Sequence, residues 1–488
     1  MQTTKMERPI LKLSSSDFLT GIAPSAHTER GGLFFSALGV TPIYDPGGTA
    51  SVENGLLQAG PAPTNIGGAT VDDVIFAADS GVVNSLNSAS FYGADGNIYR
   101  LLTNGTFTEV KTGITSPKAG IKYWRNGLYY WNNADVGRTT DFSTFTDTAI
   151  SPTGLASNIP APHIFQDNLY YFHNAGVRLD RLTDVTTNEE DILDFEAGQI
   201  GTAISDDGVF LVVILTFNQQ GADVFATNRV LFWDTFSSSW QREYIIQDPF
   251  IWSARRLGNS VICFGQYGIY EVSFGGGVRK ILDRLIGFGN TDDLLFGYGF
   301  NRADIYNQQA LIFGTDASVD TFGPLASDLP SAYLKPFKVP SGVGTPTCVF
   351  SKFAVGSVYV GTDGDKLYRY DFDGATRETS VSAQTVYFPL PFKVQIHKIV
   401  VALGEPLASG DAFDIDTKID EDTAAVDYDS CSFAVEGAIR KKVMTPKTNK
   451  TPIPEDQISF VLNFTGGAPK IKKISVYGTP MEETSSYA

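Results

Sequence analysis

One small pattern recurs through most of this chain: an apolar strand, a turn containing Gly, Asn or Asp, and a second strand that carries Tyr. The copies are Phe91 to Leu101, Tyr123 to Trp131, Ile164 to Phe172, Val261 to Val272 and Val358 to Tyr370. Apolar residues alternate on both sides of each turn, and the turn residues tolerate the positive φ angles of tight hairpins. Each copy is therefore predicted to form a β-hairpin, with Gly96, Gly127 and Gly364 at positive φ.

The spacing of such hairpins narrows the fold. Their centres near residues 96, 127, 167, 208, 265, 311 and 363 have a mean spacing of about 44 residues, the length of one four-stranded blade. We predict an all-β chain in which residues 75–385 form a β-propeller of about seven blades, with little helix. Six or eight blades also fit, because boundaries deduced from one sequence shift by several residues.

The two ends of the chain follow a different rhythm. In residues 1–74, Gly- and Pro-containing stretches interrupt every apolar run, which predicts an extended arm that can supply a closing strand. Residues 386–480 are predicted to form a small C-terminal β-sandwich or jelly roll, and residues 481–488 a flexible tail. The expected C-terminal strands are Phe388 to Val401, Ala412 to Ile419, Ser432 to Val435, Ile458 to Phe464 and Ile471 to Tyr477.

Composition excludes several classes of function. The 37 basic and 54 acidic side chains give a net charge of −17, which repels nucleic-acid phosphates and argues against sequence-specific DNA binding. The three cysteines fit neither a disulfide framework nor a zinc site, so we expect buried thiols. The first residues lack the apolar run of a signal peptide, and we expect the protein to fold in a reducing cytoplasm.

Established catalytic and cofactor-binding motifs are absent from the sequence, so we predict neither an enzyme nor a cofactor. His163 and His173 bracket one hairpin but stand ten residues apart, and the pair Asp206-Asp207 is interpreted as loop charge rather than as sugar-cleaving carboxylates. The acids between Asp411 and Asp429 lack the spacing and glycine of an EF-hand loop, although calcium binding there stays open.

Acidic and basic side chains of the C-terminal region are separated along the sequence. Such segregation favours charge complementarity between subunits, with two independent solvated faces as the alternative. The predicted interface residues are the acids Asp414, Asp416, Asp420, Glu421 and Asp422 and the bases Arg440, Lys441 and Lys442.

The layout of the chain resembles the tail hub, or nozzle, proteins of short-tailed bacteriophages and their relatives. Ser253 to Val272 is similar to a late blade hairpin of that family, and Lys470 to Gly478 to its final strand. The resemblance implies a structural virion protein that forms a homo-oligomeric ring, commonly sixfold, around the tail channel, where it seals and then conducts genomic DNA. It implies contacts with other tail proteins such as the adaptor and fibres, transient contact with passing DNA, no membrane insertion, and assembly in the host cytoplasm.

Two other functions stay open. A carbohydrate- or receptor-binding propeller at a tail tip is favoured if the 21 Tyr and 5 Trp residues surround an exposed pocket. A propeller glycosidase or lyase is favoured only if two carboxylates converge in the central mouth of the propeller.

Overall fold

The computed structural model describes most of the chain, in two compact units. One unit comprises Thr64–Val319 and Val339–Arg369, and the other comprises Met1–Pro63, Asp320–Lys338 and Tyr370–Ala488. The described residues are 8–20, 34–38, 40–42, 56–66, 74–79, 89–93, 96–101, 107–114, 120–132, 135–151, 162–173, 177–217, 227–265, 268–283, 303–306, 309–314, 318–324, 331–352, 356–362, 364, 366–372, 376–390, 392–420, 424–447 and 451–481.

Seven four-stranded antiparallel sheets follow one another along the chain. The first sheet consists of β6 (Val74–Asp79), β7 (Ala89–Gly93), β8 (Ile98–Leu101) and β9 (Phe107–Lys111), and the second of β10 (Ile121–Trp124), β11 (Gly127–Asn132), β12 (Asp135–Thr139) and β13 (Phe145–Ile150). The third sheet consists of β14 (His163–Phe165), β15 (Asn168–His173), β16 (Arg178–Leu182) and β17 (Asn188–Asp194), and the fourth of β18 (Gln199–Asp206), β19 (Leu211–Phe217), β20 (Thr227–Trp233) and β21 (Arg242–Gln247). The other three are β22 (Ile251–Leu257), β23 (Ser260–Gly265), β24 (Gly268–Ser273) and β25 (Gly277–Asp283); β26 (Ala303–Tyr306), β27 (Ala310–Gly314), β28 (Ser318–Gly323) and β29 (Ala332–Lys338); and β30 (Pro346–Lys352), β31 (Ser357–Thr362), β32 (Lys366–Asp371) and β5 (Thr64–Asn65).

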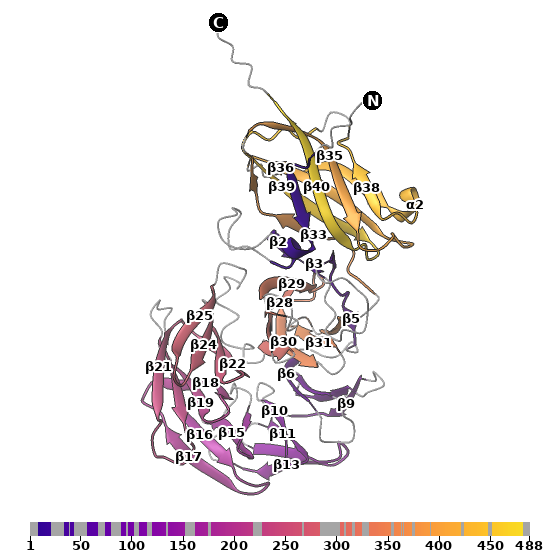
Figure 1. Cartoon of the computed structure of the whole chain (residues 1–488). Helices are drawn as coiled ribbons and strands as arrows, with labels where there is room; N and C mark the ends of the chain where they lie inside the picture. Colours follow the sequence, from indigo (N-terminus) through magenta and orange to yellow (C-terminus); the bar gives the residue numbers. More distant parts are fainter. Residues whose placement is uncertain are drawn as a thin grey trace, which may run out of the picture. The chain divides into compact units, whose positions relative to one another are not determined.

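The first strands of these sheets contact one another in the order β10, β6, β30, β26, β22, β18 and β14 (Figure 1). The ring of Trp131 on β11 packs against that of Tyr171 on β15, with centroids 5.4 Å apart, so the sheets at the two ends of this order also touch. The seven sheets therefore form a ring, which is a β-propeller. Within the described residues helix is limited to two single turns, α1 (Ser15–Phe18) and α2 (Phe433–Glu436), as the sequence predicts.

The recurring tyrosines have a structural role in neighbouring sheets. The hydroxyls of Tyr130 and Tyr171 donate hydrogen bonds to Asp147 and Asn188, in each case a residue 17 positions later. A buried phenol needs such a partner, and both rings are fully buried. Tyr99 lies on the third strand of its sheet, whereas Tyr130 and Tyr171 lie on second strands. Tyr130 and Tyr171 are therefore structurally equivalent, and Tyr99 is not equivalent to either.

All five predicted hairpins are confirmed, but two of the three predicted turn glycines are not. Gly96 has φ of +83°. Gly127 and Gly364 lie outside the left-handed region, and the Tyr123 to Trp131 hairpin turns one residue earlier, at Arg125 and Asn126 with φ of 42° and 60°. Close packing explains these two glycines, because an added Cβ would lie 2.8 Å from Arg138 Nε at Gly127 and within 2.4 Å of a backbone oxygen at Gly364.

The second unit contains two six-stranded sheets. One has the order β3 (Val40–Pro42), β4 (Leu57–Ala59), β40 (Ile471–Pro480), β35 (Val394–Leu403) and β38 (Lys441–Met444), with β1 (Leu11–Ser14) also paired to β40. The other has the order β2 (Phe34–Leu38), β33 (Val381–Thr385), β39 (Gln457–Gly466), β36 (Ala412–Ile419) and β37 (Val426–Ser432), with β34 (Phe388–Pro389) also paired to β39.

Three details of the second unit differ from the sequence prediction. The expected strand Ser432 to Val435 is mostly the turn α2, which ends where Gly437 takes φ of +71° and donates its N–H to Phe433 O at 2.8 Å. The segment predicted as an extended arm contributes β1 to β4 to the six-stranded sheets. The propeller is predicted to extend to residue 385. Its last strand in sequence, β32, ends at Asp371, and β33 belongs to a six-stranded sheet. Alternation reveals a strand but not its partner.

Replacing Gly96 with Ala is expected to destabilise the protein by about 1 to 2 kcal/mol more than replacing Gly113. Both glycines have positive φ, +83° and +73°, but only at Gly96 would the new Cβ lie 2.4 Å from the carbonyl oxygen of Ile114. Urea unfolding of the two Ala variants measures the difference. Equal losses in the two variants would contradict the packing argument.

Candidate functional site

Charged and polar side chains gather on the first strands of the propeller sheets. We call this set the axial cluster: Lys122 on β10, His163 on β14, Asp206 on β18, Arg255 and Arg256 on β22, Asp304 on β26 and Ser351 on β30. Six of the seven first strands contribute to it. Because these strands contact one another around the ring, side chains from sheets that are distant in sequence come together.

Four members of the axial cluster share one register position. Lys122, His163, Arg255 and Asp304 each lie two residues before the last paired residue of a first strand. Those last pairs are Trp124↔Gly127, Phe165↔Asn168, Leu257↔Ser260 and Tyr306↔Ala310. Equal positions on these four first strands place the side chains at one level of the ring, which explains why Lys122 interacts electrostatically with both Arg255 and Asp304.

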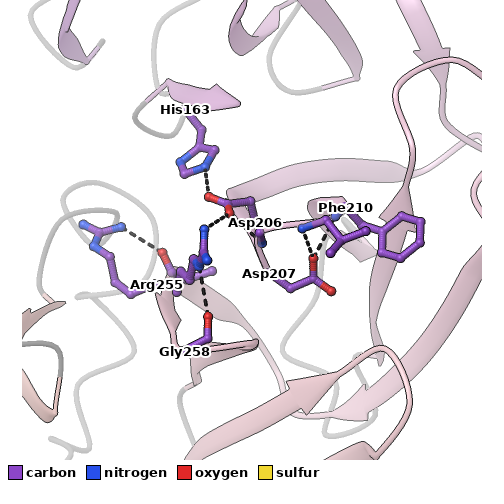
Figure 2. A network of polar contacts seen from close by, with 10 residues as sticks. His163, Asp206, Asp207, Phe210, Arg255 and Gly258 are labelled. Atoms are coloured by element: carbon purple, nitrogen blue, oxygen red, sulfur yellow. Dashed lines mark hydrogen bonds and ion pairs between the residues drawn. The ribbon is translucent and has the colours of Figure 1, made fainter. Parts of the chain in front are cut away.

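Asp206 is the most heavily bonded acid of the cluster. Its carboxylate lies 2.8 Å from His163 Nε2 (Figure 2). It also lies 2.8 Å from Arg256 Nη1 and 2.8 Å from the backbone nitrogen of Gly208. Burial raises the pKa of Asp206, but its interactions with His163, followed by the positive charge of Arg256 and the Gly208 N–H, outweigh burial and hold the pKa below its ordinary value. The group is therefore ionised at neutral pH.

His163 is hydrogen-bonded to this acid and interacts electrostatically with two bases of the cluster. Burial lowers the pKa of His163, and the positive charges of Lys122 and Arg255 lower it further, against the opposing effect of Asp206. The imidazole is therefore neutral at neutral pH. Because an ionised carboxylate carries no proton, Nε2 of His163 is the hydrogen-bond donor to Asp206.

Asp304 is held from two sides. Its Oδ2 accepts hydrogen bonds from the backbone nitrogen and the hydroxyl of Ser351, at 2.8 and 2.9 Å, and its Oδ1 lies 4.0 Å from Arg255 Nε. Arg255 also donates from Nη1 to the carbonyl of Ala254 at 2.9 Å. Burial lowers the pKa of Arg255, yet a guanidinium keeps its proton in proteins.

Lys122 is the member without a direct partner. Burial, followed by repulsion from Arg255, lowers the pKa of Lys122 to about 8, although Asp304 and Asp206 act in the opposite direction. Over the residues that the structure describes, no hydrogen bond or ion pair reaches its ammonium group. Sequence reasoning missed this residue, since a single lysine in an apolar strand has no distinguishing signal until the ring brings the other charges near it.

The cluster is poorly arranged for glycoside hydrolysis. That reaction needs one carboxyl group to hold a proton as general acid, whereas Asp206 is kept ionised and each of the two acids already faces an arginine. The second predicted histidine does not join the site. His173 forms a separate buried pair with Asp180, at 2.6 Å from Nδ1 to Oδ1.

The predicted subunit-interface residues have partners of their own in several cases. Asn463 donates to both Asp414 and Asp416, and Asp420 accepts the backbone N–H groups of residues 455–457. Lys442 pairs with Glu436. Glu421 and Asp422 lie outside the described residues. In the described ranges, no ion pair joins the bases at 440–442 to the acids at 414–420, and Arg440 and Lys441 are exposed without a partner.

The described residues contain no group of three or more His, Cys, Asp or Glu side chains that could hold a metal ion. The cysteines Cys263, Cys348 and Cys431 are buried and unpaired, as predicted. Burial raises the pKa of Cys348 to about 12 and that of Cys431 to about 11, so neither thiol is reactive at neutral pH.

In the part of the chain that is described, no helix combines the length and apolarity needed to cross a membrane.

No known protein family matches this chain, and no curated protein sequence is similar to it. Among solved structures, catalytically inactive virginiamycin B lyase from Staphylococcus aureus is 12% identical, with a TM-score of 0.47, 63% of this chain covered and 98% of that chain. The Dos1 propeller is 14% identical (TM-score 0.43; 66% and 96% covered), and the Neurospora crassa Pan2 WD40 domain is 9% identical (TM-score 0.44; 66% and 97% covered). At these values none of them bears on activity, substrate or partner. The resemblance to phage tail hubs therefore stays a prediction.

Replacing Lys122 with Met is expected to stabilise the protein at pH 7 by about 1 to 3 kcal/mol. The folded state binds the Lys122 proton less tightly than the unfolded state, whose pKa is near 10.5. The charged lysine therefore destabilises the fold fully below pH 8, and this effect fades as the pH rises from about 8 to 10.5. Urea unfolding across this range measures the difference between variant and wild type.

The exposed residue Lys12 on β1 supplies the control. Its replacement with Met is expected to leave stability within about 0.5 kcal/mol of wild type. A Lys122→Met variant that is less stable than wild type by the same amount at every pH would show that the lysine is well compensated in the folded state.

Proposed function

We propose that this chain is a structural, non-enzymatic protein of a bacteriophage tail, a hub or nozzle subunit that forms a ring around the DNA channel. In this role it seals the packaged genome and later conducts it. The two stretches that carry the resemblance lie in ordered parts of the fold. Ser253 to Val272 spans most of β22 and β23 and continues into β24, and Lys470 to Gly478 covers most of β40.

The architecture in this proposal is a seven-bladed propeller followed by a C-terminal β-sandwich. Each of the seven hairpin centres predicted from sequence falls in a different four-stranded sheet, which supports one blade per sheet. The two six-stranded sheets each contain strands whose buried and less buried positions alternate, as along β36. This pattern is typical of two sheets that pack face to face.

The observation that carries the ring proposal is a surface of the second unit around β38, which we call the basic edge. It consists of Arg440 and Lys441, both exposed and unpaired within the described residues, with Val435 and Val443 exposed by 81% and 49%. β38 is the last strand of its sheet. Exposed charge beside exposed apolar surface suits a contact with an acidic neighbour, and every copy of this chain carries a net charge of −17.

A heterologous contact of this kind closes into a ring when the rotation per subunit divides a full turn. The other tail proteins, adaptor and fibres, would then contact the assembled ring, and the acidic net charge lets a DNA duplex pass without strong binding. The proposal places the protein in the virion tail after assembly in the host cytoplasm, and it involves no cofactor.

Reversing the charge of the basic edge is expected to weaken assembly. The double variant Arg440→Glu, Lys441→Glu should lose the cyclic oligomer that wild type forms with its tail partner, and added salt should mimic that loss because it screens surface charges. Lys442 is left unchanged since it pairs with Glu436. Mass photometry measures the oligomer, and thermal melting verifies that the variant is folded.

The control is the double variant Arg8→Glu, Lys12→Glu, which makes the same charge change at two exposed residues of the same unit. It should assemble like wild type. A wild-type chain that stays monomeric and never joins purified tails would end the ring proposal and favour a free-standing binding propeller.

A second candidate function is a receptor- or carbohydrate-binding propeller at the tail tip. The axial cluster favours it, because a few convergent polar side chains can fix the orientation of a bound ligand. The cluster gives less support to a glycosidase or lyase, since its acids are paired with arginines.

A further inference from the structure

We propose that the axial cluster binds a singly charged oxyanion, the carboxylate or phosphodiester group of a small ligand, beside Lys122. This inference is independent of ring assembly, because it concerns the propeller alone. It rests on the charge balance of the cluster, on the hydrogen bonds that hold its two acids, and on the position of Lys122 among them.

The charge balance of the cluster leaves one positive charge over. Arg256 is paired with Asp206 at 2.8 Å, and Arg255 faces Asp304 at 4.0 Å. His163 is neutral, so the charges of the axial cluster sum to +1, and among the described residues no ion pair reaches the ammonium group of Lys122. A partly buried ammonium group without a direct counterion is unfavourable. A single negative charge placed beside Lys122 would balance the site.

The acids of the cluster cannot easily turn toward Lys122 to supply that charge. Asp304 is fixed by two hydrogen bonds from Ser351, and Asp206 by Gly208, His163 and Arg256. Moving either carboxylate would break contacts that are already formed. Lys122 can therefore bind an anionic ligand without rearrangement of the two acids, as in a pre-organised binding site.

The same balance decides the charge of the ligand. A dianion would leave one negative charge uncompensated near Asp206 and Asp304, whereas a cation would be repelled by Lys122, Arg255 and Arg256. A monoanionic oxyanion fits both constraints. Lys122 offers three N–H donors, and a carboxylate or a phosphodiester offers matching acceptors.

Binding should depend on pH because of Lys122. The charged groups that face it are Asp206 from β18, Arg255 from β22 and Asp304 from β26, with neutral His163 on β14. A bound anion favours the protonated lysine, whose pKa in the free protein is about 8. Affinity is therefore expected to fall as the pH rises from about 7 to about 9, and binding near pH 8 should take up protons from the buffer.

The test uses the full chain and three probes, glucuronate for the carboxylate, dimethyl phosphate for the phosphodiester, and inorganic phosphate, mostly a dianion at pH 8. Isothermal titration calorimetry in two buffers measures affinity and proton uptake, and sodium chloride at equal ionic strength controls for screening. We expect glucuronate or dimethyl phosphate to bind more tightly than inorganic phosphate, and the tighter of the two identifies the ligand class.

Variants of Lys122 link the binding to this side chain. Lys122→Met should weaken affinity at least about tenfold, while replacement of the exposed Lys12 with Met should leave it unchanged. Lys122→Arg keeps the charge but removes the titration, since a guanidinium stays protonated. It should bind at pH 7 and lose the decrease in affinity between pH 7 and 9, which keeps the test decisive even where the Met variant does not fold.

The proposal is overturned if neither monoanion binds beyond the effect of sodium chloride, or if Lys122→Met binds as wild type does. Tighter binding of inorganic phosphate than of both monoanions would also overturn it, because the charge argument would then be wrong. Failure here leaves the ring proposal intact, since that depends on the basic edge and is measured by assembly.

Discussion

The fold depends on the pairing of a two-residue strand, β5, with β32. Asn65 and Thr64 pair with Tyr368 and Arg369, and the N–H of Ile66 donates to Leu367 O at 3.0 Å. This contact completes the last sheet of the ring with a segment from the other end of the propeller. Without it, β32 would present an unpaired edge, and only side-chain packing, such as that of Tyr99 and Leu101 against Cys348 and Leu367, would hold the last sheet beside the first.

The axial cluster shows why this closure matters for function as well as for stability. No sheet alone brings two opposite charges of the cluster together, because its lysine, histidine, acids and arginines come from five different first strands. The polar groups exist as a site only in the closed ring. Most of the surrounding interior is apolar and aromatic, with Trp131, Tyr170 and Phe172 fully buried. Apolar packing does not account for the charged side chains on the first strands.

The sequence allowed the hairpins to be predicted because alternation and turn residues are local signals. Their details depended on packing: the turn before Gly127 is formed by Arg125 and Asn126, and the glycine itself is required by Arg138. The site was harder. In the sequence, Asp206 and His163 each stand out separately, whereas Lys122, Asp304 and Ser351 do not. Which of them converge is set by the order of the ring, and one sequence does not contain that order.

The pairing of β1 with β40 places Leu11 opposite Val476, which are 465 positions apart. During synthesis the first strands therefore leave the ribosome long before their partners exist. The propeller can close once β32 has emerged, but the sheet that holds β1 must wait for the final strand. Folding is then ordered by translation, propeller first and terminal sheets last. A chain cut short by premature termination would carry a closed propeller and unpaired N-terminal strands, a form that quality control in the cell can distinguish from the finished protein.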